Sequence, residues 1–195
     1  KTLLLLASMF IGVMAFAQRV APVPSFTALV DDGETILYLY NIEYGGFLLG
    51  ANEWGTRASL SKEKGYKMKI AQMYEDDEKT IPLGTWALCD SCEAGGKAGK
   101  WSEYDCQGYD NIWCDGDGRG GAGMWVLTAL GGNKYEITNT NVPGLNFGWA
   151  PYVGDATNNR VWMLDYEQEE SEGMAFLPEQ AGTEWAFVTP EAYEA

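Results

Sequence analysis

The chain has 195 residues, a formal net charge of −15 and no histidine. Without histidine it lacks the commonest general base, the commonest neutral metal ligand and one member of every Ser–His or Cys–His catalytic pair. Nucleic acid is also excluded as a partner, because 28 acidic side chains stand against only 13 basic ones that could neutralise phosphates. A hydrophobic share of 46% and 24 glycines indicate one globular domain of short strands and turns.

The first 17 residues have the organisation of a secretory signal peptide. Lys1 is followed by an apolar run over residues 3–14 and then by Ala15-Phe16-Ala17, which fits an A-x-A cleavage site. The run is shorter than the ~20 residues that a membrane-spanning helix needs, so a membrane anchor is the weaker alternative. We expect cleavage between Ala17 and Gln18, a secreted or cell-surface protein, and no membrane span in the mature chain.

The two segments that flank the main part of the chain differ in character. Residues 18–34 contain Pro22 and Pro24 and show no periodicity, which predicts a linker into a domain at residues 35–188. Thr189-Pro190-Glu191 predicts a helix start, because a capping hydroxyl precedes proline at the first helical position and an acid in the first turn. Residues 189–195 could begin a following helical region or form a short docked helix.

Between residues 35 and 188, about a dozen short strand-like runs alternate with glycine-rich turns, which is typical of an all-β sandwich or barrel. The runs group in fours, with an aromatic residue in each opening run and another in each closing run. Three four-stranded units, none able to bury its own apolar face, predict a β-trefoil around a shared core. The opening aromatics are Tyr38, Trp86 and Tyr135, and the closing ones are Tyr66, Trp125 and Trp185. The predicted runs are 35–40, 47–49, 57–60, 66–70, 85–88, 100–104, 111–114, 124–127, 134–138, 145–149, 160–164 and 185–188.

Two stretches carry a family resemblance. The stretch LYNIEYGGFLLGANEWGTRASL at residues 39–60 resembles the opening repeat of a secreted, ricin-type-like β-trefoil domain of Bacteroidetes-type gut bacteria. The stretch WAFVTPE at residues 185–191 is similar to the same group, in which the trefoil runs on into a helical region. Typical ricin-type lectins carry Gln two residues before the closing-strand Trp, where this chain has Gly123 and Thr183. The resemblance therefore implies fold and secretion, but neither galactose-type binding nor a defined activity.

Four cysteines, Cys89, Cys92, Cys106 and Cys114, lie close together in the second unit. Their C-x2-C and C-x7-C spacing could form a four-thiolate zinc site, but an oxidising compartment favours disulfides. Four cysteines allow three pairings, and the sequence does not choose among them. We favour the nested pairing of Cys89 with Cys114 and Cys92 with Cys106, because it would tie the ends of two strands.

Carboxylates are frequent but form no specific catalytic pattern. The alternation Asp115-Gly116-Asp117-Gly118 suits a calcium loop only in part, because further ligands are missing at the required offsets and Arg119 stands among them. Paired acids such as Asp76-Asp77 could serve a glycosidase, yet nearly every loop of so acidic a chain supplies such a pair. We expect no catalytic activity, no resident metal and no cofactor.

Tryptophans beside turns are the candidate ligand-binding residues. An aromatic ring can pack against the C–H face of a sugar while neighbouring amides bond its hydroxyls. Asn52 with Trp54, and Asn146 with Trp149, have this composition, although turn tryptophans also pack the ends of trefoil barrels. The other aromatic residues placed in or beside turns are Trp101, Tyr109, Tyr152 and Trp162.

The sequence therefore predicts a secreted, non-catalytic interaction module that binds carbohydrate. A protein-binding adhesin or inhibitor module is the alternative, since trefoil loops suit both uses. A carboxylate-dependent glycoside hydrolase is the less favoured hypothesis. The expected partner is a glycan or an extracellular protein.

Overall fold

The computed structural model describes residues 23–49, 57–90, 100–105, 111–116, 121–155, 157–165, 170–171, 174–175 and 177–195. The predicted signal peptide, residues 1–17, and the first part of the predicted linker lie outside these residues. The described part consists of short β-strands, two 3₁₀ turns and one α-helix. The 3₁₀ turns are Gly121–Gly123 and Pro178–Gln180. A separate two-stranded sheet is formed by β13 (Glu170–Ser171) and β14 (Met174–Ala175).

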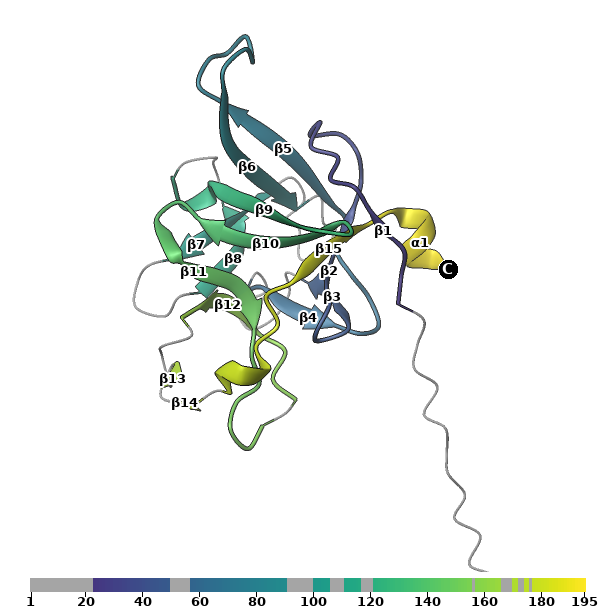
Figure 1. Cartoon of the computed structure of the whole chain (residues 1–195), viewed down its shortest axis with the longest axis vertical. Helices are drawn as coiled ribbons and strands as arrows, with labels where there is room; N and C mark the ends of the chain where they lie inside the picture. Colours follow the sequence, from purple (N-terminus) through teal and green to yellow (C-terminus); the bar gives the residue numbers. More distant parts are fainter. Residues whose placement is uncertain are drawn as a thin grey trace, which may run out of the picture.

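Twelve of the strands fall into three units of four in chain order (Figure 1). The first unit comprises β2 (Tyr38–Asn41), β3 (Gly46–Leu49), β4 (Ser59–Ser61) and β5 (Met68–Tyr74). The second comprises β6 (Pro82–Asp90), β7 (Lys100–Asp105), β8 (Asn111–Gly116) and β9 (Trp125–Gly131). The third comprises β10 (Lys134–Asn139), β11 (Val142–Trp149), β12 (Val161–Leu164) and β15 (Trp185–Val188).

The first and last strands of the units form a closed barrel. Antiparallel pairs join β5 to β6, β6 to β9, β9 to β10, β10 to β15 and β15 to β2. A bridge between Leu37 and Met68 closes the ring. The two middle strands of each unit pair with each other. These three pairs are joined by the Arg57–Trp113 bridge between the first and second units, the Ser59–Arg160 bridge between the first and third, and the pairing of β8 with β12 between the second and third. This arrangement is a β-trefoil, so the predicted fold is confirmed.

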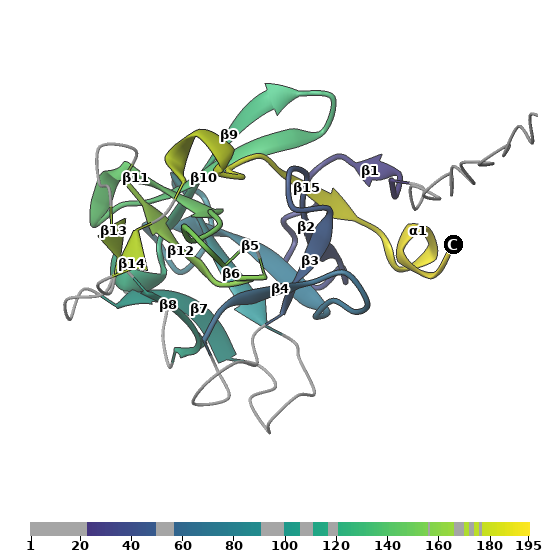
Figure 2. The ribbon, with the colours of Figure 1, turned by 90° about the horizontal axis from the view of Figure 1, so that it is seen from below.

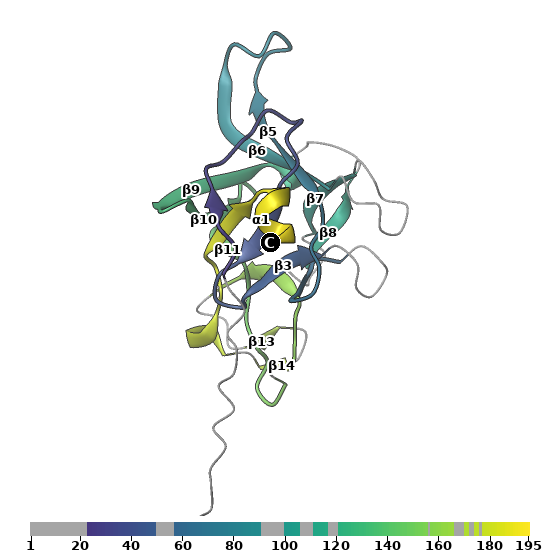
Figure 3. The ribbon, with the colours of Figure 1, turned by 90° about the vertical axis from the view of Figure 1, so that its right-hand side faces the viewer.

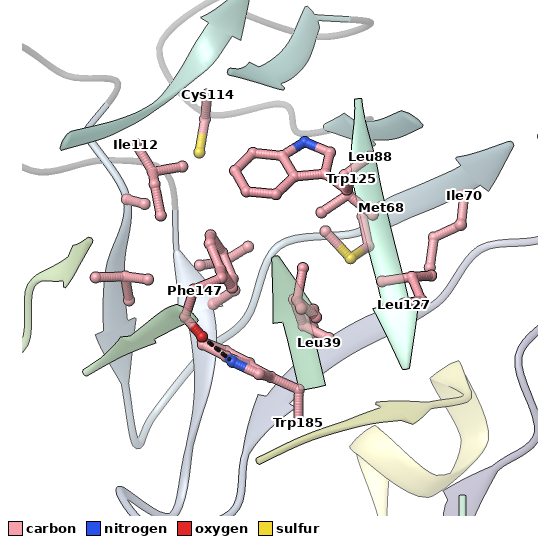
Figure 4. Packing of buried hydrophobic residues seen from close by; sticks show 14 of the residues in the cluster. Leu39, Met68, Ile70, Leu88, Ile112, Cys114, Trp125, Leu127, Phe147 and Trp185 are labelled. Atoms are coloured by element: carbon pink, nitrogen blue, oxygen red, sulfur yellow. Dashed lines mark hydrogen bonds between the residues drawn. The ribbon is translucent and has the colours of Figure 1, made fainter. Parts of the chain in front are cut away.

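A single core is shared by all three units (Figure 4). The rings of Trp125, Phe147 and Trp185 are fully buried. The centroid of the Phe147 ring lies 5.3 Å from that of Trp125 and 4.8 Å from that of Trp185. The indole N–H of Trp185 donates to the backbone oxygen of Phe147 at 2.6 Å, so this buried polar atom is satisfied. Smaller apolar side chains fill the space around the rings, among them Leu39, Met68, Ile70, Leu88, Ile112, Cys114 and Leu127.

The strand register corrects one of the predicted closing positions. Trp125 lies opposite Asn139, and Trp185 lies opposite Asn41. The corresponding pair between the first and second units joins Met68 to Asp90. Met68 therefore occupies the position that was expected for Tyr66. Tyr66 is buried as well, but it packs with Leu49 in a small separate cluster.

The asparagine opposite Trp185 fixes a corner of the barrel. Asn41 is completely buried, and its amide nitrogen donates to the backbone oxygen of Gly182 at 2.9 Å. Its side-chain oxygen accepts from the backbone N–H of Tyr44 at 2.9 Å. The residue thus joins the turn that leaves β2 to the segment that enters β15.

Asn139 repeats this arrangement in the third unit. It is completely buried, its amide donates to the backbone oxygen of Ala122 at 2.8 Å, and its oxygen accepts from the N–H of Asn141 at 3.0 Å. Ala122 and Gly182 each lie three residues before a closing-strand tryptophan. Asn41, Asp90 and Asn139 follow one another at intervals of 49 residues. The three-fold repeat is therefore visible in polar contacts as well as in the core.

The described part of the predicted linker packs against the domain. Its strand β1 (Phe26–Thr27) pairs with β15. The N–H of Leu29 donates to the hydroxyl of Tyr135 at 3.2 Å, and the indole of Trp86 donates to the carboxylate of Asp31 at 2.8 Å. Two aromatic residues assigned to packing thus also hold this segment in place.

The C-terminal helix α1 (Pro190–Glu194) begins where the sequence predicts it. Thr189 is the N-cap, and its hydroxyl accepts an N–H from the first turn. The ring of Tyr193 stacks on Tyr38 with centroids 3.9 Å apart, and its hydroxyl accepts from the N–H of Gly65 at 2.9 Å. The helix is therefore docked on the first unit. No helix in the described part of the chain is long and apolar enough to span a membrane.

The buried asparagines are expected to be important for stability. Asn41→Ala leaves the N–H of Tyr44 without its acceptor and removes the bond to Gly182, so we expect a loss of about 1–3 kcal/mol in the free energy of unfolding. Asn139→Ala should cost a similar amount. Urea denaturation followed by tryptophan fluorescence measures both. Asn141→Ala, at an exposed position, is the control, and a loss there equal to that of Asn41→Ala would contradict the argument.

Candidate functional site

The structure places only two of the four predicted ligand residues, and they do not face each other. Asn52 and Trp54 lie outside the described residues, so that pair stays a prediction. Asn146 and Trp149 both lie in β11, which pairs with β12 in unbroken register over this stretch. Side chains three residues apart in a strand point to opposite faces of the sheet. Asn146 and Trp149 therefore cannot hold one sugar together from this strand.

Trp149 is partly buried and takes part in packing. Its indole N–H donates to the backbone oxygen of Asn158 at 2.6 Å. Its ring meets the ring of Tyr44 edge to face at 5.0 Å, and the ammonium of Lys62 lies 5.1 Å from the centre of the Tyr44 ring. These contacts connect the first and third units and favour the packing interpretation for Trp149.

The remaining turn aromatics fall into two groups. Tyr152 lies directly before the turn at residues 153–154, as expected, whereas Trp162 lies within β12. Both are buried, at 3% and 2% exposed, and their tilted rings lie 5.1 Å apart in a small cluster with Leu164. They are therefore core residues. Only the backbone of Trp101 is described, and Tyr109 lies outside the described residues.

The cysteine pairing also stays a prediction. Cys114 in β8 is buried in the main core. Cys92 and Cys106 lie outside the described residues, and only the backbone of Cys89 is described. Strand β7 lies between β6 and β8, so the strands that carry Cys89 and Cys114 are not neighbours. Of the predicted partial calcium loop, Asp117 and Gly118 lie outside the described residues.

The most prominent surface element is the β5–β6 hairpin, which projects from the barrel (Figures 1 and 3). Its strands pair from Met68 and Asp90 at the base to Tyr74 and Pro82 at the far end. The next strand, β9, pairs with β6 only at Trp86. The predicted runs 66–70 and 85–88 covered only the base, because the outer residues include proline, glycine and acids, which do not favour strands.

Contacts at the base brace the hairpin against the N-terminal segment. The N–H of Gly33 donates to the backbone oxygen of Ile70 at 2.8 Å, and the N–H of Gln72 donates to that of Asp31 at 3.1 Å. Lys69 and Glu34 form an ion pair at 3.3 Å. The ribbon is therefore anchored on both of its strands, since Asp31 also bonds Trp86 on β6.

A single carboxylate organises the loop at the tip. Asp76 accepts from the hydroxyl of Thr80 at 2.6 Å and from the backbone N–H groups of Thr80 and Ile81 at 3.0 and 2.8 Å. The Thr80 hydroxyl, followed by the Ile81 and Thr80 amides, lowers the pKa of Asp76 below its ordinary value. Lys79 occupies the left-handed region with φ 57°, where a non-glycine residue is uncommon. The bonds to Asp76 thus hold the loop in one conformation.

At the tip, exposed apolar and exposed acidic residues lie close together in the sequence. Ile81 is 51% exposed and Leu83 is 43% exposed. Glu75, Asp77 and Glu78 are exposed in the same loop. A hollow of about 220 Å³ adjoins the loop, and it is lined by Gln72, Met73, Tyr74, Asp76, Asp77 and Lys79.

The outer part of β6 is protected against pairing with another strand. Pro82 has no N–H to donate, and Gly84 has a φ of 69° where the register shifts between β5 and β6. Proline and bulges are features that prevent edge-to-edge association of strands. Recognition along this edge of the ribbon therefore depends on side chains and not on the backbone.

Comparison with known proteins gives the fold and leaves the ligand open. No protein-family model matches the chain, and no curated protein matches it in sequence. The structure is similar to lysenin in complex with phosphocholine, with 13% identity, a TM-score of 0.51 and coverage of 84% of this chain. This chain spans 47% of the length of that lysenin chain.

Two further structures show the same likeness. A type II water-soluble Chl binding protein has 11% identity and a TM-score of 0.53, with 80% of this chain and 91% of that chain covered. The receptor binding domain of botulinum neurotoxin D has 12% identity and a TM-score of 0.53, with 82% and 41% covered. At these identities the likeness concerns the fold alone, and it agrees with the β-trefoil topology.

The bonds made by Asp76 can be tested by hydrogen exchange. Asp76→Ala removes the acceptor of two amides, so exchange at Thr80 and Ile81 should accelerate about tenfold while the barrel amides keep their protection. Because the folded-state pKa is lowered, this stabilisation is present above the ordinary value of 3.8 and is lost as the pH falls through the folded-state pKa. Exchange measured by NMR between pH 6 and about pH 2.5, relative to intrinsic rates, should show this loss. Asp77→Ala is the matched control, and unchanged protection in Asp76→Ala would refute the argument.

The packing role of Trp149 can be tested with a conservative change. Trp149→Phe keeps an aromatic ring against Tyr44 but removes the N–H that bonds Asn158. We expect the free energy of unfolding to fall by about 0.5–1.5 kcal/mol. A variant as stable as the wild type in urea denaturation would show that this bond contributes nothing.

Proposed function

We propose that this domain is a non-catalytic protein-recognition module and that the β5–β6 hairpin contacts the partner. The observation that supports this proposal is the exposure of Ile81 and Leu83 beside a loop that Asp76 holds in one conformation. The proposal adopts the adhesin or inhibitor interpretation of the sequence in place of glycan binding through Asn146 and Trp149.

The shape of the hairpin favours a macromolecular partner. Small ligands are usually held in concave sites that bury most of their surface. A projecting ribbon is convex, and the surface that complements it is a cleft or groove in another protein. A loop already fixed before binding loses little conformational entropy on association, which favours affinity. Exposed apolar side chains at such a tip can supply the buried centre of an interface.

The fold is compatible with this use but does not specify it. β-Trefoil relatives by structure include a receptor binding domain and a complex with phosphocholine, so one fold carries different binding functions. The predicted signal peptide would deliver the domain outside the cell, where the partner would be an extracellular protein. Glycan binding at Asn52 and Trp54 stays a prediction from composition.

The proposal can be tested with a double substitution on the hairpin. Ile81→Ser with Leu83→Ser should abolish the retention of proteins captured by the wild-type domain from host mucosal secretions, because it removes the apolar contact area at the tip. Quantitative mass spectrometry of the retained proteins, followed by surface plasmon resonance on the purified partner, measures the effect. We expect an affinity loss of at least about tenfold.

The matched control is Leu130→Ser with Val153→Ser, which removes two exposed apolar side chains outside the hairpin. This variant should bind like the wild type. If the hairpin variant retains the same proteins with the same affinity, the hairpin is not the recognition element. If binding disappears only in Trp54→Ala and a glycan array shows the ligand, the glycan hypothesis replaces this one.

A further inference from the structure

We propose that the partner presents a cationic amphipathic surface to the hairpin: an apolar stripe for Ile81 and Leu83, bordered by Lys or Arg. One of these cations would enter the hollow beside the loop. This inference rests on the proposed function, because it describes the partner of the same hairpin.

The charges of the tip support a cationic partner. Residues 75–79 read Glu-Asp-Asp-Glu-Lys, and Glu75, Asp77 and Glu78 are exposed. The nearest lysines before the tip in the sequence are Lys67 and Lys69, at the start of β5. The length of this strand places them about 20 Å from the loop at the tip. That distance exceeds the screening length of about 10 Å at 0.1 M salt. The field at the tip is therefore set by the loop itself and is negative.

The hollow has the chemistry of a site for a cation. Two acidic residues, Asp76 and Asp77, line it together with Gln72, whose side-chain oxygen accepts from the hydroxyl of Tyr74 at 3.1 Å. Carboxylates accept hydrogen bonds and donate none, whereas ammonium and guanidinium groups only donate. Tyr74 also lines the hollow, and an aromatic ring attracts a cation that reaches its face. Lys79 also lines the hollow, but among the described residues it forms no ion pair that would neutralise these acids.

The exposed apolar side chains limit further which class of partner fits the tip. Ile81 follows the acidic loop directly, and Leu83 lies two residues beyond it. A partner with positive charge alone would leave both in water, and an apolar partner alone would leave the loop carboxylates desolvated without compensation. Anionic polysaccharides, nucleic acids and anionic membranes would be repelled by the loop. A protein segment with an apolar stripe flanked by Lys or Arg satisfies both parts of the tip.

Three synthetic peptides test this chemistry on the whole chain. The probes are 14-residue amphipathic sequences of Leu with Lys, Leu with Gln and Leu with Glu, identical in their apolar positions and carrying a fluorophore. Fluorescence anisotropy should show binding of the Leu/Lys peptide, binding at least about tenfold weaker for Leu/Gln, and none for Leu/Glu. Raising the salt from about 20 mM to about 500 mM should weaken the Leu/Lys complex, because screening shortens the range of the loop charges.

Matched variants locate the site. Asp77→Asn with Glu78→Gln should weaken Leu/Lys binding about fivefold, as expected for the loss of two surface charges. Glu63→Gln with Glu179→Gln removes two exposed acids outside the hairpin and should change binding less than about twofold. Ile81→Ser with Leu83→Ser should also weaken it. Circular dichroism and the thermal midpoint verify that each variant keeps the native fold.

The outcomes separate this inference from the proposed function. Equal binding of the Leu/Lys and Leu/Gln peptides, or equal losses in the hairpin variant and the charge-matched control, would overturn the cationic partner. The hairpin would still be the recognition element if Ile81→Ser with Leu83→Ser abolished binding of the captured protein while the charge variant left it unchanged. Both ideas fall together if neither hairpin variant changes the binding of that protein.

Discussion

Each four-stranded unit of this domain has an apolar face that it cannot cover alone, and the rest of the structure follows from burying the three faces together. Trp125, Phe147 and Trp185 meet at the centre, and Trp185 bonds Phe147 so that the packing does not leave its N–H unsatisfied. Around this centre, buried Asn41 and Asn139 stand at equivalent corners, and each donates to the segment before a closing strand and accepts from an N–H of the turn that follows it. Burial supplies the driving force, while the asparagines fix the register, because a displaced strand would leave their partners unpaired in the interior.

The two ends of the described chain extend this core. The segment before β2 pairs with β15, bonds Tyr135 and Trp86, and braces the base of the β5–β6 hairpin. Helix α1 docks on the first unit through Tyr193, on the same side of the molecule as β1, whereas β13 and β14 lie at the far end (Figure 2). The barrel thus supports the hairpin, which is held by contacts from both of its strands.

The hairpin combines features that a purely structural loop does not need. Asp76 uses three hydrogen bonds to fix the tip, Pro82 and Gly84 prevent strand pairing, and Ile81 and Leu83 remain exposed. A loop that is fixed before binding loses less conformational entropy when a partner binds. Apolar side chains exposed to water also make association favourable, because binding removes them from water. The acidic charge of the whole chain has a local meaning here, since the exposed acids of the tip are the basis of the proposed cationic partner.

The sequence by itself determined the fold class, because strand-type runs in three groups of four reflect how each unit must bury one face. It also determined helix α1, since capping at Thr189 is a local property of the chain. Only the tertiary structure decided which aromatic residues pack and which apolar side chains stay exposed. Tyr152 and Trp162 look like exposed turn residues in the sequence but are buried against each other, and Asn146 and Trp149 are separated by the alternation of β11. The sequence did not predict the outer part of the hairpin. Its exposure depends on the absence of neighbouring segments over it in the folded domain, and the order of residues along the chain does not show which segments will lie there.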